Sequence, residues 1–259
     1  MTGTARLRAL IALLALVSAA CGGSGTDTTT STTLPVTTGT STSTTTTTLA
    51  PTTTTAATGS TIPDDQLPGE AIAIGPAAGD ELAVVGIAHD DVLNFRTAPG
   101  TDSPVLSKLP SLTRGLIATG RARSLPESIW FEVDLDAVAG WVSSAYVGQL
   151  GQTDDATSEV IAAAGETPEG ETMLDLGMIV AEVMASDDPP SRIVMSVAPI
   201  VGDLGEVTYD VVGLGDDALG GVRLHIFGDP AEGGEAFVLS NVERTIICSR
   251  GVTDEGLCV

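Results

Sequence analysis

The chain has 259 residues, enough for two small domains, with only 3% aromatic residues and a formal net charge of −23. So acidic a surface repels nucleic-acid phosphates and anionic lipid headgroups, and we therefore expect no nucleic-acid partner. The acidity otherwise fits a solvated protein surface.

Residues 1–21 are predicted to form an export signal peptide. A charged start with two arginines precedes an apolar run, residues 10–17, that is too short to span a bilayer. Small residues then lead into Cys21, and this order resembles a bacterial lipoprotein box. The resemblance implies lipidation of Cys21 and anchoring on the extracytoplasmic face of the cell membrane. Ser18 stands where the box usually has leucine, and Ser18 with Ala20 also suits ordinary cleavage, so a secreted protein is the alternative.

Residues 22–79 are predicted to be a disordered, threonine-rich linker. Thr, Ser, Gly and Pro dominate from Thr26 to Thr61, and such a composition cannot bury enough apolar surface to fold. Stalks of this composition are commonly O-glycosylated, which would stiffen them, and an unmodified linker is the alternative. Residues 71–74 form an isolated candidate strand.

Short apolar runs separated by Pro and Gly predict a small β domain over residues 80–150. The expected strands cover residues 82–85, 92–96, 105–109, 116–120, 129–135 and 139–142. Strands of this length and spacing suit a small barrel, because closure removes unpaired strand edges.

The motifs of this domain resemble those of the bacterial Src-homology-3-like (SH3b) family. They are Asn94-Phe95-Arg96, Pro99-Gly100, Trp130-Phe131-x-Val133 and Gly140-Trp141-Val142-x-x-x-Tyr146-Val147. Phe95 occupies a position where the family usually has valine. The resemblance implies a small all-β SH3-like barrel that is exported and binds peptidoglycan or other wall polymers.

The candidate ligand-binding side chains are Trp130, Trp141, Tyr146 and Arg96. Strand alternation puts Phe131 and Trp130 on opposite faces, so Trp130 is a candidate surface platform if Phe131 is in the core. Trp141 and Tyr146 are either further aromatic contacts or packing within the barrel. Arg96 is either a ligand contact or a donor to carbonyls of the following turn.

Residues 151–259 predict a second domain of the α+β class with an antiparallel sheet, and this domain resembles no known family. Residues 148–155 are expected to be a hinge. Helices are expected at 158–164 and 172–185, and strands at 192–197, 207–212, 222–227 and 236–248. The second helix carries an apolar stripe that should face the core.

The number of cysteines and the positions of the two histidines limit the reactions that the chain can be expected to perform. Cys248 and Cys258 are expected to form a disulfide in an oxidising compartment, which leaves Cys21 for lipid. His89 and His225 lie in no nucleophile or metal-ligand pattern, and His225 should lie on a sheet face. We expect no cofactor, no metal and no catalysis.

The sequence therefore predicts an exported, membrane-anchored lipoprotein whose SH3-like domain binds cell-wall peptidoglycan or an envelope protein. In the alternative, the barrel is a spacer and the C-terminal domain recruits a partner protein. A third interpretation is a regulator of wall hydrolases or an enzyme with an unrecognised C-terminal site.

Overall fold

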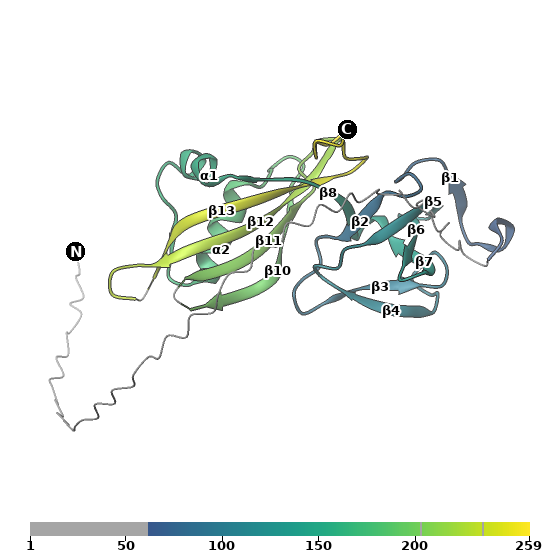
Figure 1. The fold of residues 1–259 in the computed structure, drawn as a ribbon, viewed down its shortest axis with the longest axis horizontal. Coiled ribbons are helices and arrows are strands. Elements are labelled where there is room, and N and C mark those ends of the chain that lie inside the picture. The colour runs from purple at the N-terminus through teal and green to yellow at the C-terminus, as the bar shows by residue number, and fades with distance from the viewer. Residues whose placement is uncertain (1–61, 203, 235) are drawn as a thin grey trace, which may run out of the picture. The chain divides into compact units, whose positions relative to one another are not determined.

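The computed structural model describes residues 62–202, 204–234 and 236–259. The predicted signal peptide, Cys21 and the linker up to residue 61 lie outside these residues and stay predictions. Antiparallel β-structure with two α-helices makes up the described part of the chain, as predicted (Figure 1). In this part, no helix combines the length and apolar character that a membrane crossing requires.

The N-terminal half contains eight strands and two short 3-10 turns. They are η1 (Asp64–Gln66), β1 (Glu70–Ile72), β2 (Glu81–Val84), β3 (Val92–Arg96), β4 (Val105–Pro110), β5 (Leu116–Leu125), β6 (Ser128–Leu135), β7 (Val138–Ser143), η2 (Ser144–Tyr146) and β8 (Val147–Asp155). Every strand expected between residues 82 and 142 is present, and β5 runs five residues further than expected because it bends at Gly120 and continues along β6.

The C-terminal half contains both helices and the longest strands. Its elements are α1 (Thr157–Ala164), β9 (Glu169–Gly170), α2 (Met173–Val183), β10 (Arg192–Val201), β11 (Gly205–Val212), β12 (Leu219–Pro230) and β13 (Phe237–Cys248). Both helices and all four strands that we expected are present.

The strands form one open, antiparallel arrangement. The order is β10-β11-β12-β13-β8-β2-β5-β6-β7-β3-β4, with β1 added to β5 and β9 added to β13. Among the described residues, β4 pairs only with β3 at one end and β10 only with β11 at the other. The strand order does not close on itself, so the closed barrel expected for residues 80–150 is not confirmed.

Strand β8 joins the two halves, and the hinge expected at residues 148–155 is wrong. This strand pairs with β2 through its first residues and with β13 through the rest. Its glycines allow close packing: a Cβ on Gly148 would lie 2.7 Å from Ile247 Cγ2, and one on Gly151 would lie 2.3 Å from the Gly256 carbonyl oxygen. The expected domain boundary therefore falls inside a shared strand.

A buried ion pair also ties the two halves together. Arg223 Nε and Nη2 donate to the two carboxylate oxygens of Asp210 at 2.7 and 2.8 Å. The same pair reaches the N-terminal half, because the Gly86 N–H donates to Asp210 at 2.8 Å and Arg223 donates to the Val84 carbonyl at 2.9 Å. Loss of either partner would leave a buried, unpaired charge, so this ion pair holds the junction in one arrangement.

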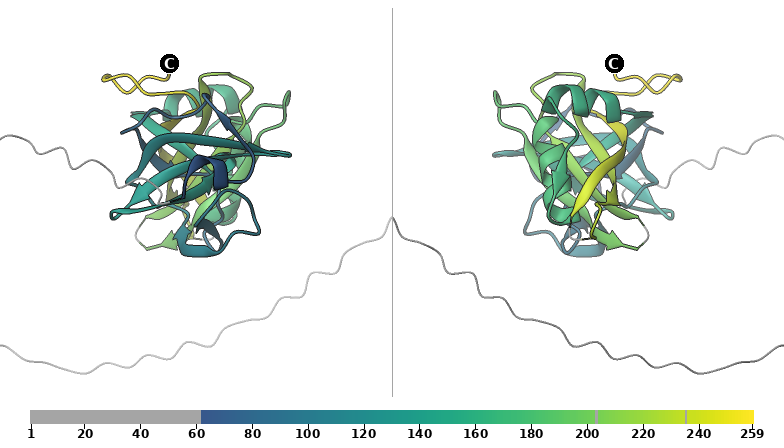
Figure 2. Two further views of the ribbon diagram at one scale, coloured as in Figure 1. Left: turned by 90° about the vertical axis from the view of Figure 1, so that its right-hand side faces the viewer. Right: turned by 90° about the vertical axis from the view of Figure 1, so that its left-hand side faces the viewer.

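Helices α1 and α2 cover one face of the sheet formed by β10 to β13 (Figures 1 and 2). Helix α2 begins at a capping box in which Thr172 and Asp175 bond each other's backbone N–H groups. The expected apolar stripe faces the sheet, with Met173, Leu176 and Val180 fully buried. Gly177 belongs to the same face, because a Cβ there would lie 2.6 Å from the Tyr209 ring.

A separate apolar core fills the N-terminal half, with Phe95, Val133 and Val142 among its buried side chains. Phe95 fits because Gly140 has no side chain, and a Cβ there would lie 2.6 Å from the Phe95 ring. The large Phe95 side chain is thus accommodated by a neighbouring glycine.

The predicted disulfide between Cys248 and Cys258 is confirmed, with the two Cα atoms 5.2 Å apart. It holds the C-terminal tail against the end of β13, and the Gln152 N–H adds a hydrogen bond of 2.8 Å to the Gly256 carbonyl. The tail is therefore fixed to both β13 and β8.

Candidate ligand-binding face

Strands β5, β6, β7 and β3 share a face that points away from the N-terminal core. Trp130 pairs with Arg123 on one side and Ser143 on the other, and Trp141 pairs with Glu132 and Arg96. Directly paired residues of antiparallel strands point to the same side. This face, termed the outer face, therefore consists of Arg96, Arg123, Trp130, Glu132, Trp141 and Ser143.

The expected alternation in β6 is confirmed, but the solvent exposure of Trp130 is not. Phe131 packs against the N-terminal core, and Trp130 lies on the opposite face. Trp130 is only 4% exposed and Trp141 is fully buried, so neither indole is a surface platform. Leu67, from a segment that we expected to be disordered linker, is buried in one cluster with both tryptophans, and Ile62, Ala98 and Leu125 pack against this cluster.

The end of the expected linker is folded. Residues 62–67, termed the strap, contain η1 and lie over the outer face. Strand β1 follows and pairs with residues 122–124 of β5, so the strand expected at 71–74 exists at residues 70–72 and is not isolated. The folded unit therefore begins before residue 80, where we had placed its start.

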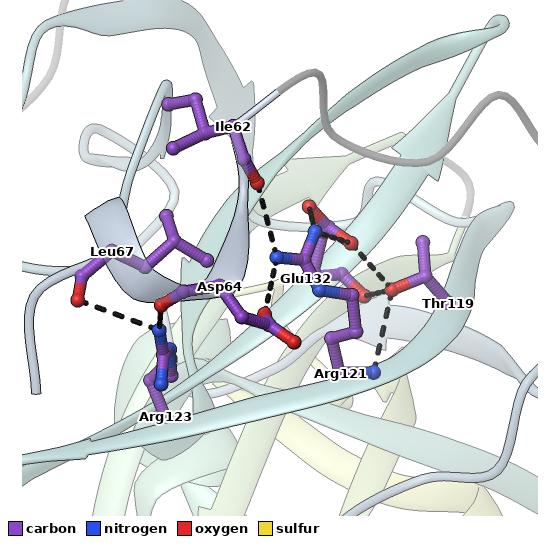
Figure 3. A network of polar contacts seen from close by, with 7 residues as sticks. All are labelled: Ile62, Asp64, Leu67, Thr119, Arg121, Arg123 and Glu132. Atoms are coloured by element: carbon purple, nitrogen blue, oxygen red, sulfur yellow. Dashed lines mark hydrogen bonds and ion pairs between the residues drawn. The ribbon is translucent and has the colours of Figure 1, made fainter. Parts of the chain in front are cut away.

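Arg121 and Glu132 organise the polar network beneath the strap (Figure 3). Arg121 Nη1 donates to the buried Glu132 carboxylate at 2.8 and 3.1 Å, and the Thr119 hydroxyl donates to the same group at 2.8 Å. Arg121 Nη2 donates to Asp64 of the strap at 2.6 Å. Burial alone would lower the pKa of Arg121, but the two carboxylates outweigh it and raise that pKa. The Arg121 guanidinium also lowers the pKa of Asp64, through their hydrogen bond and its charge.

A pocket of about 510 Å³ opens on the outer face beside β3 and η2. Its lining includes the side chains of Asn94, Arg96, Trp130, Tyr146 and Arg192. The pocket brings together Arg96, Trp130 and Tyr146, three of the four expected site residues, and it does not include Trp141. Arg192 comes from β10, so both halves of the molecule contribute.

The arginines of this pocket form no ion pair with any residue that the structure describes. Arg96 donates to the Ser103 carbonyl at 2.6 Å, which confirms the turn-bonding interpretation. Arg192 donates to the Gly86 carbonyl at 2.8 Å, and its guanidinium lies 5.0 Å from the centre of the Tyr146 ring. Asp91 is the one acidic side chain among the residues lining the pocket, and one of its oxygens accepts the neighbouring backbone N–H.

Among the other described arginines, four form ion pairs with carboxylates, namely Arg121, Arg223, Arg244 and Arg250, whereas Arg114 and Arg123 form none. The pocket therefore concentrates two guanidinium groups whose charge is not paired with a carboxylate. Carboxylates and phosphates are the groups that such guanidiniums bind best.

A second pocket of about 450 Å³ lies on the polar face of the C-terminal sheet. His225 lines it, as expected for a residue on a sheet face, with its Nε2 2.9 Å from Glu206 Oε2 and its Nδ1 3.8 Å from Glu243 Oε2. Arg114 also lines this pocket and has no ion-pair partner among the described residues. No group of three or more potential metal-ligating side chains occurs in the part of the chain that the structure describes.

Searches against protein-family models, curated proteins and solved structures find no match to this chain. Sequence reasoning missed Arg192 and Leu67 as parts of the binding face. Leu67 is a lone apolar residue within a polar stretch, which is a weak signal. No local pattern connects Arg192 with Tyr146, because their contact depends on how the two halves pack.

Proposed function

We propose that the protein is an exported, lipid-anchored envelope protein whose N-terminal half is SH3-like and binds peptide-bearing cell-wall material such as peptidoglycan. The observation that supports this proposal is the pocket shared by Arg96, Trp130, Tyr146 and Arg192. Its binding groups come from strands and a 3-10 turn rather than from a long loop, so they are held in place before a ligand arrives.

The chemistry of the pocket suits a peptide with free carboxylates. Arg192 and Arg96 supply guanidinium donors, and the Tyr146 ring supplies a flat apolar surface beside them. The Asn94 amide, which has no hydrogen-bond partner among the described residues, can bond a peptide group in both directions. Wall peptides carry both features, carboxylates and amides.

The N-terminal segments fit this role in our proposal. Lipid on Cys21 would retain the protein at the membrane, and the threonine-rich linker would allow the folded part to reach into the wall. We propose binding without turnover, because the basic, aromatic and amide groups of the pocket suit recognition of a peptide.

Sedimentation with purified peptidoglycan tests the proposal. The full chain should bind, and Tyr146→Ala or Arg192→Gln should each weaken binding by about 1–3 kcal/mol, since a buried aromatic or arginine contact is lost. Because the contact is ionic, raising the salt concentration should weaken binding of the unaltered protein more than that of Arg192→Gln.

Arg250→Gln is the matched control, because Arg250 is exposed, pairs with Asp217 and does not line this pocket. This variant should bind peptidoglycan as the unaltered protein does. If the pocket variants and the control sediment equally, the pocket is not the wall-binding site.

The second candidate function is recruitment of an envelope protein by the C-terminal half. The pocket around His225, Glu206 and Arg114 favours it, because it offers charges of both signs on an exposed sheet face. In that case an Arg114→Gln variant would lose the partner protein while keeping full binding to peptidoglycan.

A further inference from the structure

The strap covers the tryptophans with little apolar surface of its own. Of its residues only Leu67 is fully buried, and the four from Pro63 to Gln66 are exposed. The indoles of Trp130 and Trp141 lie beneath Leu67, with Ile62 partly buried against the same cluster. Removing the strap would therefore take away the apolar cover that Leu67 and Ile62 give to the two indoles, the largest apolar side chains of the outer face.

Arginine side chains hold the strap through groups that any peptide presents (Figure 3). Arg121 donates to the Ile62 carbonyl at 3.2 Å and to the Asp64 carboxylate at 2.6 Å. Arg123 donates to the Asp64 carbonyl and, at 3.4 Å, to the Leu67 carbonyl. The arginines and tryptophans together, termed the cradle, thus bind a short peptide through its backbone, one carboxylate and one leucine.

Two donors of the cradle lack acceptors while the strap is bound. Arg123 Nε and Trp141 Nε1 are buried without a hydrogen-bond partner among the described residues. Both residues are more than nine-tenths buried, at 6% and 0% exposure. A peptide that supplied acceptors to these donors would gain bonds that the strap does not make. The resident segment is therefore not the best possible occupant of the cradle.

The strap can lift without unfolding the strands next to it. Pro68 and Gly69 separate it from β1, and Gly69 has a φ of +75°, which favours glycine. Strand β1 is anchored independently by its pairing with β5. Residues 62–67 can thus rotate as a unit about Pro68 and Gly69.

We propose that the cradle is a docking site for an acidic peptide segment of another protein, with the strap as its exchangeable internal occupant. The segment would present an aspartate and, three residues later, a leucine, as Asp64 and Leu67 do. The internal strap competes at high effective concentration, so the partner binds strongly only when it outcompetes the strap or when the strap is withdrawn. This proposal does not depend on binding to the wall.

Tryptophan fluorescence reports directly on the cradle, because the chain has only two tryptophans and both lie in it. In the full chain, the double variant Asp64→Asn, Leu67→Ala should shift the emission to longer wavelength and increase quenching by acrylamide. A synthetic peptide with the sequence of residues 62–68 should reverse both changes. It should bind the double variant at least about tenfold more tightly than the unaltered protein, in which the strap blocks the site.

Two controls separate docking from general loosening. Asp65→Asn changes an exposed neighbour that makes no ion pair among the described residues, and it should leave emission and peptide affinity unchanged. A peptide with asparagine and alanine in place of the aspartate and leucine should not bind. Far-UV circular dichroism checks that each variant is folded. If the double variant is not folded, the same emission and peptide-binding measurements are made on the single variant Asp64→Asn.

Equal binding of the two peptides, or equal affinity of the double variant and the unaltered protein for the 62–68 peptide, would overturn the proposal. Unchanged emission in both strap variants would also overturn it, because the strap would then not cover the site in solution. Light scattering would detect a third outcome, a dimer that the peptide does not dissociate. Such a dimer would identify a second copy of the chain as the occupant of the cradle and would overturn the proposal of a different partner protein.

Discussion

Two covers lie over sheet faces in this molecule, and they are built differently. Helices α1 and α2 cover the C-terminal sheet with a continuous apolar core, in which Met173, Leu176 and Val180 of α2 are fully buried. The strap covers the outer face with one buried leucine and four hydrogen bonds from two arginines. The helices are thus held by apolar packing, whereas the strap is held by hydrogen bonds around a single buried side chain, Leu67.

This difference separates a structural cover from an exchangeable one. Each fully buried Leu, Val or Met side chain contributes about 1.5–3 kcal/mol. The hydrogen bonds of the strap are exchangeable, since on its release the arginines and carbonyls can bond to water instead. The helices should therefore stay in place until the whole protein unfolds, whereas the strap should detach at a much smaller free-energy cost.

The largest expected effect tests the helix cover. Leu176→Ala should lower the free energy of unfolding by about 3 kcal/mol, because it leaves a cavity between α2 and the sheet. Urea unfolding followed by far-UV circular dichroism measures this change. Leu174→Ala is the matched control, since Leu174 lies on the same helix but is 44% exposed, and it should change stability by less than about 0.5 kcal/mol.

A smaller effect is expected when the same substitution is made in the strap. Leu67 is 7% exposed and hence nearly as buried as Leu176, yet Leu67→Ala should cost only about 1 kcal/mol in the same urea experiment. The loss is limited because the strap can open locally while the sheets remain folded. A cost equal to that of Leu176→Ala would make the strap a structural element like α2 and remove the distinction between the two covers.

The sequence predicts the regular elements of both regions well, because each has a clear periodicity. The apolar stripe of α2 repeats at helical spacing, and alternation correctly put Phe131 and Trp130 on opposite faces of β6. Closure of the N-terminal strands depends on long-range pairing, which local patterns do not report. The open strand order was for that reason not foreseen.

The strap and β8 were missed for a shared physical reason. Both are polar segments whose order comes from contacts with distant residues. Residues 148–155 were expected to be a hinge, but Gly148 and Gly151 permit close approach of β13 and the C-terminal tail. In the strap, the partners are Arg121 and Arg123 of β5, which lie far along the chain. Composition alone cannot distinguish such a segment from a disordered linker.

The smallest expected effect is the pH dependence of strap binding. Arg121 lowers the pKa of Asp64 in the folded protein, first through their hydrogen bond and then through its charge. A group with a lowered pKa stabilises the folded arrangement above its unfolded pKa, and this stabilisation is lost as the pH falls through the folded value. The strap should thus be held at neutral pH and should loosen below about pH 4, where free aspartate becomes protonated.

Tryptophan emission of the full chain, titrated from neutral to acidic pH, measures this loosening. The unaltered protein should shift to longer wavelength at the acidic end, and Asp65→Asn should do the same. In Asp64→Asn the ion pair is already absent, so its emission should start at longer wavelength and should change less with pH. Identical titration curves for Asp64→Asn and Asp65→Asn would show that the Asp64 carboxylate does not hold the strap. The exchangeable cover would then depend on Leu67 and the backbone carbonyls alone, and the preference for an acidic peptide would have no basis.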